Sequence, residues 1–151
     1  MVALVLVGHS LELLRGLRAM LSQAAPGLLV GVAGGTDAGA LGTSAPLILN
    51  AVRSVLAASP QGAVVLLDLG SAALALEMAL DDLGPSERAI VRVSRGALVE
   101  GAVRAAVEAA GGGSLASVVS ASETPAGRDK LPDDWPPDGA APGGLARRLG
   151  R

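Results

Sequence analysis

The stretch VALVLVGHSLELLRGLRAMLSQAA, residues 2–25, determines the fold class of this chain. It opens on a continuous apolar run, VALVLV (2–7), which is typical of a strand buried on both faces of a parallel sheet. The segment 11–25 then carries four leucines at helical spacing, which predicts a helix with one apolar face. A buried strand followed at once by such a helix is the first half of a βαβ unit.

The same alternation recurs along the chain. Further strands are predicted at 28–34, 63–67 and 89–93, and further helices at 44–59, 72–82, 98–110 and 115–121. Ser44 is the expected N-cap of the second helix, with Pro46 in its first turn. The pattern predicts an α/β fold with three layers. We expect a doubly wound open sheet, mainly parallel, of strand order 2-1-3-4, with helices on both faces.

Composition divides the chain into two parts. Half of the 151 residues are apolar but only 1% are aromatic, so the core must be built from Ala, Val, Leu and Ile. Residues 1–123 are expected to form one domain. The last 28 residues, 124–151, hold five Pro and five Gly, a composition typical of a flexible tail. A short docking element around Trp135, the only tryptophan, is the alternative.

Several classes of protein are disfavoured. The net charge of −2 and the lack of a Lys/Arg cluster argue against a nucleic-acid partner. The chain has no cysteine, which excludes disulfides and thiolate metal sites, and we expect no metal or cofactor of its own. The apolar run 2–7 is too short to span a membrane and has no basic segment before it, so a cytoplasmic protein is expected.

The turn Gly-His-Ser after the first strand resembles the nucleophile elbow of hydrolases, which would make Ser10 catalytic. That elbow needs a small residue where this chain has Glu12. An activated serine also needs a base, and the only histidine, His9, belongs to the same turn. The only lysine, Lys130, lies in the tail. Serine hydrolysis is therefore rejected.

His9 is the stronger candidate because it follows the first strand, at the edge where open α/β sheets bind ligands. Asp68 ends the third strand and, in the order 2-1-3-4, lies beside it. A carboxylate that accepts a hydrogen bond from one ring nitrogen leaves the other nitrogen free to attack phosphorus. The alternatives are a structural histidine and an Asp68 that only caps the next helix.

A phosphorylated imidazole needs hydrogen-bond donors. Helices beginning near Ser10, Ser44 and Ser71 would aim N–H groups at the same crevice. Gly8, Gly42 and Gly70 would let the backbone come close. Ser71 could instead be an N-cap, the glycines of 34–42 an ordinary loop, and Asp37 a turn former. No G-K-[ST] follows these glycines, so a nucleotide-binding P-loop is not predicted.

Four segments also resemble a known family. LVLVGHS (4–10), GGTDAGALGTSAPLI (34–48), DLGSAALALEMAL (68–80) and ALVEGAVRAA (97–106) are similar to the phosphocarrier subunit, DhaM, of bacterial phosphoenolpyruvate-dependent dihydroxyacetone kinase. The resemblance covers residues 1–122. That family is related to the mannose-type IIA domains of the sugar phosphotransferase system.

The resemblance implies a phosphoryl carrier. His9 would accept a phosphoryl group from the phosphocarrier protein HPr and pass it to ADP bound on a partner kinase subunit. Asp68 matches the acidic residue beside that histidine, and a homodimer is implied. The predicted phosphate-binding residues are Ser10, Gly42, Thr43, Ser44, Gly70 and Ser71.

Two alternatives share the fold: a mannose-type sugar IIA domain and a regulatory module that is phosphorylated on histidine. The sugar domains usually read DLFGGSP where this chain reads DLGSA (68–72), which favours the dihydroxyacetone branch. The chain departs from the family at Gly8, where a serine often precedes the histidine, and at 95–97, where a proline is common. Some members continue into an HPr-like domain; here we expect dependence on separate HPr.

Overall fold

The fold is described from a computed structural model, which defines residues 1–125, 130, 135 and 136. Most of the predicted tail therefore lies outside the described residues, and the boundary at residue 123 stays a prediction. The strands are β1 (Ala3–Gly8), β2 (Val30–Gly34), β3 (Ala63–Leu67) and β4 (Val91–Val93). The helices are α1 (Leu11–Ala24), α2 (Ala45–Ala58), the 3-10 helix η1 (Gly70–Ala72), α3 (Ala73–Asp81), α4 (Pro85–Ala89), α5 (Leu98–Ala110) and α6 (Leu115–Glu123).

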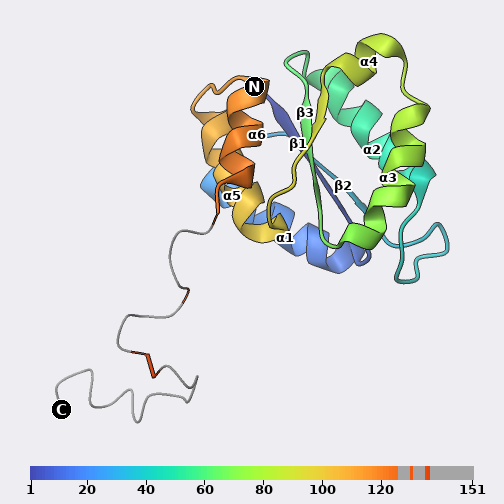
Figure 1. The fold of residues 1–151 in the computed structure, drawn as a ribbon, viewed down its shortest axis with the longest axis horizontal. Coiled ribbons are helices and arrows are strands. Elements are labelled where there is room, and N and C mark those ends of the chain that lie inside the picture. Colours follow the sequence, from blue (N-terminus) through green and yellow to red (C-terminus); the bar gives the residue numbers. More distant parts are fainter. Residues whose placement is uncertain (126–129, 131–134, 137–151) are drawn as a thin grey trace.

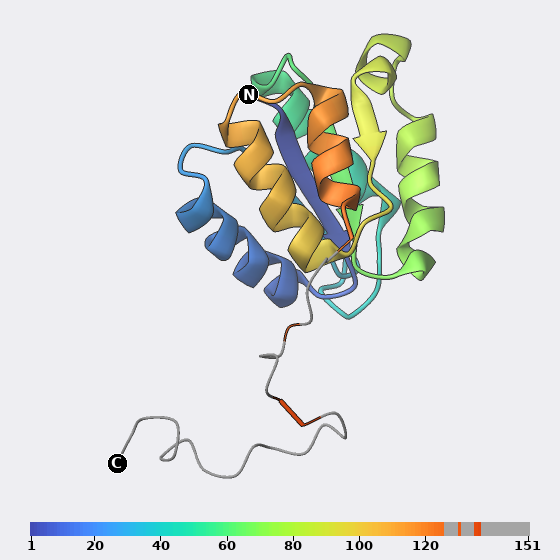
Figure 2. The same ribbon diagram turned by 60° about the vertical axis from the view of Figure 1, so that its left-hand side comes forward.

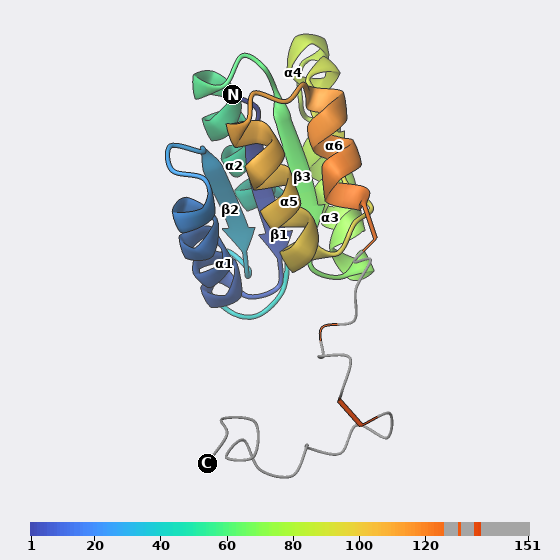
Figure 3. The same ribbon diagram turned by 90° about the vertical axis from the view of Figure 1, so that its left-hand side faces the viewer.

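The four strands form one parallel sheet in the order β2-β1-β3-β4, which confirms the predicted topology. Helices α1, α5 and α6 lie on one face and α2 and α3 on the other, giving three layers (Figures 1 and 3). In the register of β1 and β3, Val7 lies level with Leu67. Gly8 and Asp68, which follow these two residues, are therefore neighbours at the carboxyl edge of the sheet.

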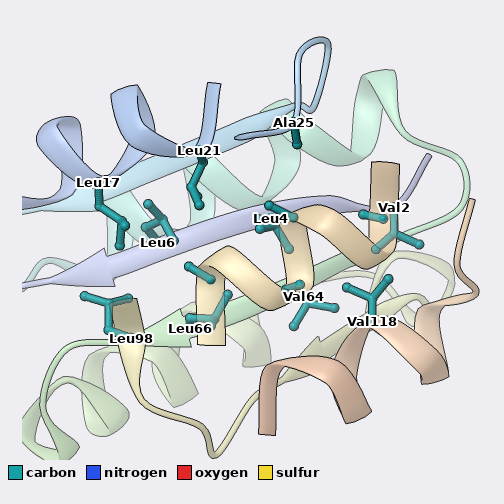
Figure 4. Packing of buried hydrophobic residues seen from close by; sticks show 14 of the residues in the cluster. Val2, Leu4, Leu6, Leu17, Leu21, Ala25, Val64, Leu66, Leu98 and Val118 are labelled. Carbon is teal, nitrogen blue, oxygen red and sulfur yellow. The ribbon is translucent and has the colours of Figure 1, made fainter. Parts of the chain in front are cut away.

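Alternate side chains of β1 enter two separate cores, because successive residues of a strand point to opposite faces. Leu4 and Leu6 pack with α1, α5 and α6, whereas Val5 and Val7 pack with α2 and α3. Figure 4 shows the first of these cores, where Leu17 and Leu21 of α1 face β1. Each fully buried leucine contributes roughly 1.5–3 kcal/mol by leaving water.

Small side chains bring α5 close to the sheet, as the composition predicted. Its buried residues include Ala102, Ala105, Ala106 and Ala109. Gly101 is also required there, because a Cβ at that position would lie 2.7 Å from the carbonyl oxygen of Ser122 in α6. Figure 2 shows α5 and α6 side by side in front of the sheet, with β1 visible between them.

Two predicted helix starts are confirmed by their caps. Ser10 accepts a hydrogen bond from the backbone N–H of Leu13 and begins α1. Ser44 accepts one from Leu47 and begins α2, with Pro46 in the first turn. Each cap satisfies a backbone donor that the helix itself leaves unpaired.

The main errors of the sequence prediction lie around the last strand. The segment 89–93 was predicted as a strand, but β4 starts only at Val91 because Pro85–Ala89 form the short helix α4. Pro85 sits at the first helical position, and the Glu87 carboxylate accepts from the N–H of Gly84, which stabilises that start. Likewise β2 begins at Val30 rather than at residue 28, since Leu28 closes a turn on Ala25.

In the part of the chain that the structure describes, no helix combines the length and apolar character needed to cross a membrane.

Candidate functional site

His9 and Asp68 meet at the carboxyl edge of the sheet, where β1 and β3 end. The Nδ1 atom of His9 lies 3.1 Å from Oδ1 and 3.2 Å from Oδ2 of Asp68. The residues are 59 positions apart in the sequence, and the parallel register of β1 and β3 brings them together. The imidazole keeps 30% of its side-chain surface exposed, whereas the carboxylate keeps 14%. The ring is thus held on one side and open on the other.

The Asp68 carboxylate is an acceptor for three N–H groups. Besides the imidazole, the backbone N–H of His9 donates to Oδ2 at 2.8 Å and that of Leu69 donates to Oδ1 at 2.7 Å. Burial raises the pKa of Asp68, but these hydrogen bonds and the nearby His9 outweigh that effect, so the pKa lies below the ordinary aspartate value. Asp68 is therefore ionised near neutral pH and can only accept.

This geometry determines the state of the imidazole. Because ionised Asp68 has no proton to give, Nδ1 of His9 must carry the hydrogen and donate it. In the neutral ring, Nε2 then holds the lone pair. The hydroxyl oxygen of Ser71, in η1, lies 3.2 Å from Nε2 and can donate to that lone pair. Nε2 thus faces an exposed serine.

Two backbone hydrogen bonds join the loop between β2 and α2, residues 35–43, to the turn that carries His9. The N–H of Gly35 donates to the carbonyl of Gly8, and the N–H of Gly42 donates to the carbonyl of His9. Gly35 and Gly42 have φ of 80° and 143°, a region that favours glycine. The loop therefore holds the backbone on both sides of the imidazole.

A cleft of about 340 Å³ lies between this loop and the start of α1. Its lining includes His9, Glu12, Thr36 and Asp37. The Asp37 carboxylate accepts from the hydroxyl of Ser44 at 2.8 Å, which joins the loop to the N-terminus of α2. No arginine or lysine lines the cleft, and the described residues hold no cluster of three His, Cys, Asp or Glu that would suit a metal.

The predicted phosphate-binding residues lie in different surroundings. Ser71 is beside Nε2, and exposed Gly70 precedes it in η1. Ser10 caps α1, and the N–H of Gly42 donates to the carbonyl of His9. Thr43 is half-buried and lies between Gly42 and the N-cap of α2. The Ser44 hydroxyl is already engaged with Asp37 and Leu47. The structure therefore gathers Gly70 and Ser71 at the open nitrogen, while Gly42 and Ser44 support the backbone around it; phosphate binding by each stays a prediction.

Two of the alternative interpretations of single residues do not match the structure. Asp68 does not cap the following helix, because η1 and α3 have no side-chain cap. Ser71 is not an N-cap either, since it lies within η1. Asp37 does lie in a turn, but its carboxylate binds the hydroxyl of Ser44 and it also lines the cleft. Sequence reasoning missed Thr36, which lines the cleft. Thr36 lies in a loop, and loops have no hydrophobic periodicity that could have indicated it.

The chain matches known proteins over most of the described fold. Residues 3–119 match the EIIA-man family, described as the fructose IIA component of the phosphotransferase system (PTS). DhaM of Klebsiella michiganensis, named the phosphoryl donor subunit of PEP-dependent dihydroxyacetone kinase, is 37% identical over 123 residues, which cover 79% of this chain. DhaM of Escherichia coli K12, named in the same way, is 36% identical over the same length.

The chain spans about a quarter of the length of these curated relatives, 26% in each case. A solved structure of a protein of unknown function, EF1359, is similar with a TM-score of 0.71 and 28% identity. That match covers 82% of this chain and 95% of the other.

Proposed function

The chain belongs to the EIIA-man family of PTS components, and on that premise we propose that it is the phosphoryl carrier of a PEP-dependent dihydroxyacetone kinase. In this proposal His9 takes a phosphoryl group from the phosphocarrier protein HPr. It then passes the group to ADP held on a kinase subunit. The family description alone would equally suit a sugar-specific IIA domain, but the relatives that are 36–37% identical are named as DhaM.

The orientation of one ring carries the proposal. Asp68 binds Nδ1, which leaves Nε2 as the nitrogen that can attack phosphorus. The Nε2 lone pair forms a bond to the phosphorus of phosphorylated HPr while the bond from phosphorus to the imidazole of HPr breaks. The ring of His9 becomes positively charged as the new bond forms, and the Asp68 carboxylate, already bound to Nδ1–H, stabilises that charge.

In this proposal the Ser71 hydroxyl makes one hydrogen bond before phosphoryl transfer and a different one after it. Before transfer it donates to Nε2 at 3.2 Å, and it must turn away when phosphorus approaches. After turning, it can donate to an oxygen of the bound phosphoryl group, together with the N–H groups at the start of η1. In the second step an oxygen of ADP attacks phosphorus, the bond to Nε2 breaks, and its electron pair returns to the ring.

The proposed site needs neither metal nor nucleotide from this chain, because the attacking group and its orienting carboxylate are both side chains. The two transfer partners, a homodimeric form and a cytoplasmic location are parts of this proposal. Transfer to a kinase subunit is supported by the names of the relatives, which call them phosphoryl donor subunits. HPr as donor, the homodimer and the cytoplasmic location rest on the resemblance to DhaM alone.

The experiment supplies phosphoenolpyruvate, enzyme I and HPr to the untagged protein and measures its intact mass. We expect one phosphoryl adduct that is labile in acid, and none in His9→Ala. After the donor system is removed, adding the ADP-loaded kinase subunit and dihydroxyacetone should remove the adduct from the wild type and form phosphorylated dihydroxyacetone. An adduct that persists in His9→Ala would refute the site. An adduct that is never passed on would favour the regulatory alternative.

A further inference from the structure

The space beside Gly8 is occupied by the Asp68 side chain. A Cβ placed on Gly8 would lie 2.6 Å from Cγ, 2.6 Å from Oδ2 and 3.1 Å from Cβ of Asp68. Neighbouring strands are usually about 4.7–4.9 Å apart, so a Cβ-to-Cβ separation of 3.1 Å is far closer than a paired sheet permits. Any side chain at residue 8 would force the carboxylate to move.

The backbone of Gly8 does not itself require glycine. Its φ is not positive, unlike that of Gly35 or Gly42. Gly8 is the last residue of β1 and pairs with Gly34 of β2 in ordinary parallel register. The absence of a side chain therefore serves the contact with Asp68 and not a special backbone conformation.

That contact matters because all the hydrogen bonds of Asp68 depend on where its carboxylate lies. Oδ2, one of the two atoms a Cβ would strike, accepts from the N–H of His9 at 2.8 Å and lies 3.2 Å from Nδ1. Moving the carboxylate off Gly8 would lengthen these bonds or break one of them. The imidazole would then lose the partner that determines which of its nitrogens carries the hydrogen.

The geometry points to Gly8 as a positioning residue: its missing side chain lets Asp68 lie against the end of β1 and orient the His9 ring for phosphoryl transfer. This inference rests on the proposed function, since it names what holds the nucleophile in place. The inference is specific to this chain, because the related family often has serine at this position beside the same acidic residue. Here the Asp68 side chain occupies the space that a serine side chain at residue 8 would take.

The test compares Gly8→Ala and Gly8→Ser with two controls. Gly31→Ala introduces similar crowding in β2, where a Cβ would lie 2.9 Å from Val55 Cγ1, but it does not touch Asp68. Gly16→Ala, in α1, meets nothing within 4 Å. We expect both Gly8 variants to accept the phosphoryl group from HPr roughly tenfold more slowly per folded molecule. The two controls should match the wild type.

A spectroscopic measurement separates this effect from a general loss of stability. His9 is the only histidine in the chain, so an untagged protein gives a single set of imidazole signals in NMR spectra. The wild type and both controls should show a protected Nδ1–H proton, and the Gly8 variants should lose it. A Gly8→Ala protein that keeps this signal and the wild-type rate would overturn the inference. The signal does not depend on phosphorylation, so it remains informative even if the wild type accepts no phosphoryl group.

A double variant tests whether Gly8 acts through Asp68. If it does, Gly8→Ala combined with Asp68→Ala should be no slower than Asp68→Ala alone. The combined variant should also unfold at a higher temperature than Gly8→Ala, since removing the carboxylate relieves the crowding. This second readout applies even if Gly8→Ala is too unstable to assay. If the two substitutions slow the reaction independently, or if the double variant unfolds at no higher temperature than Gly8→Ala, Gly8 does not act through Asp68.

Discussion

Replacing Asp68 by asparagine keeps the size of the side chain but removes its charge and one of its two acceptor oxygens. The native carboxylate accepts from the backbone N–H groups of His9 and Leu69 and from Nδ1 of the imidazole. An asparagine has a single acceptor oxygen, so its NH₂ group must face at least one of these donors. If it faces Nδ1, the ring must place its hydrogen on Nε2 instead, where the nucleophilic lone pair is needed.

The magnitude follows from the hydrogen bond that is lost. A hydrogen bond to a charged group contributes about 1.5–3 kcal/mol, and each 1.36 kcal/mol corresponds to a tenfold change in rate. Losing the bond between Nδ1–H and Asp68 should therefore slow phosphorylation of His9 by roughly 10- to 150-fold. Trapping the wrong tautomer would slow it further, by up to about 10⁴-fold in a comparable histidine–aspartate pair.

The assay is a rapid-quench measurement of phosphoryl transfer from phosphorylated HPr to the protein, followed by intact mass. Glu77→Gln is the matched control, because it removes one exposed carboxylate from α3 and does not line the cleft beside His9. We expect the control to transfer at the wild-type rate. An Asp68→Asn protein within about threefold of the wild type, a difference below about 0.7 kcal/mol, would show that the carboxylate does not orient the nucleophile.

Two further predictions concern the same site. Ser71→Ala removes the hydroxyl beside Nε2. The free protein loses a neutral hydrogen bond of about 0.5–1.5 kcal/mol and the phosphorylated protein loses one to a charged group of about 1.5–3 kcal/mol. The difference of about 1–1.5 kcal/mol should lower the amount of phosphorylated protein at equilibrium with HPr roughly 5- to 13-fold. An unchanged equilibrium would contradict a role for this hydroxyl in holding the phosphoryl group. The lowered pKa of Asp68 also predicts a dependence of stability on pH. The carboxylate stabilises the fold fully above the ordinary aspartate pKa, and this contribution disappears as the pH falls through the lowered value. Urea unfolding should therefore show a difference in the free energy of unfolding between the wild type and Asp68→Asn that is constant near neutral pH and shrinks in acid. A difference that grows in acid would contradict a lowered pKa of Asp68.

Much of the fold was predictable because it depends on short-range patterns. The apolar run of β1 and the leucine stripe of α1 follow from periodicity, and capping by Ser10 and Ser44 follows from side chains that bond their own helix ends. The strand order was predictable because parallel strands joined by helices allow few arrangements. The short helix α4 was missed because Pro85 both ends one helical pattern and begins another.

The sequence by itself also identified the two residues that meet at the candidate site. It contains one histidine, located after a buried strand, and an aspartate that ends the strand predicted to lie beside it. Only the tertiary structure decided how they are arranged. Which nitrogen Asp68 binds, that Ser71 lies at the other nitrogen and that Gly8 leaves room for the carboxylate depend on contacts across 59 to 62 residues of chain. Such contacts are set by strand register and side-chain packing to fractions of an ångström, and neither is encoded in the local pattern that a sequence displays.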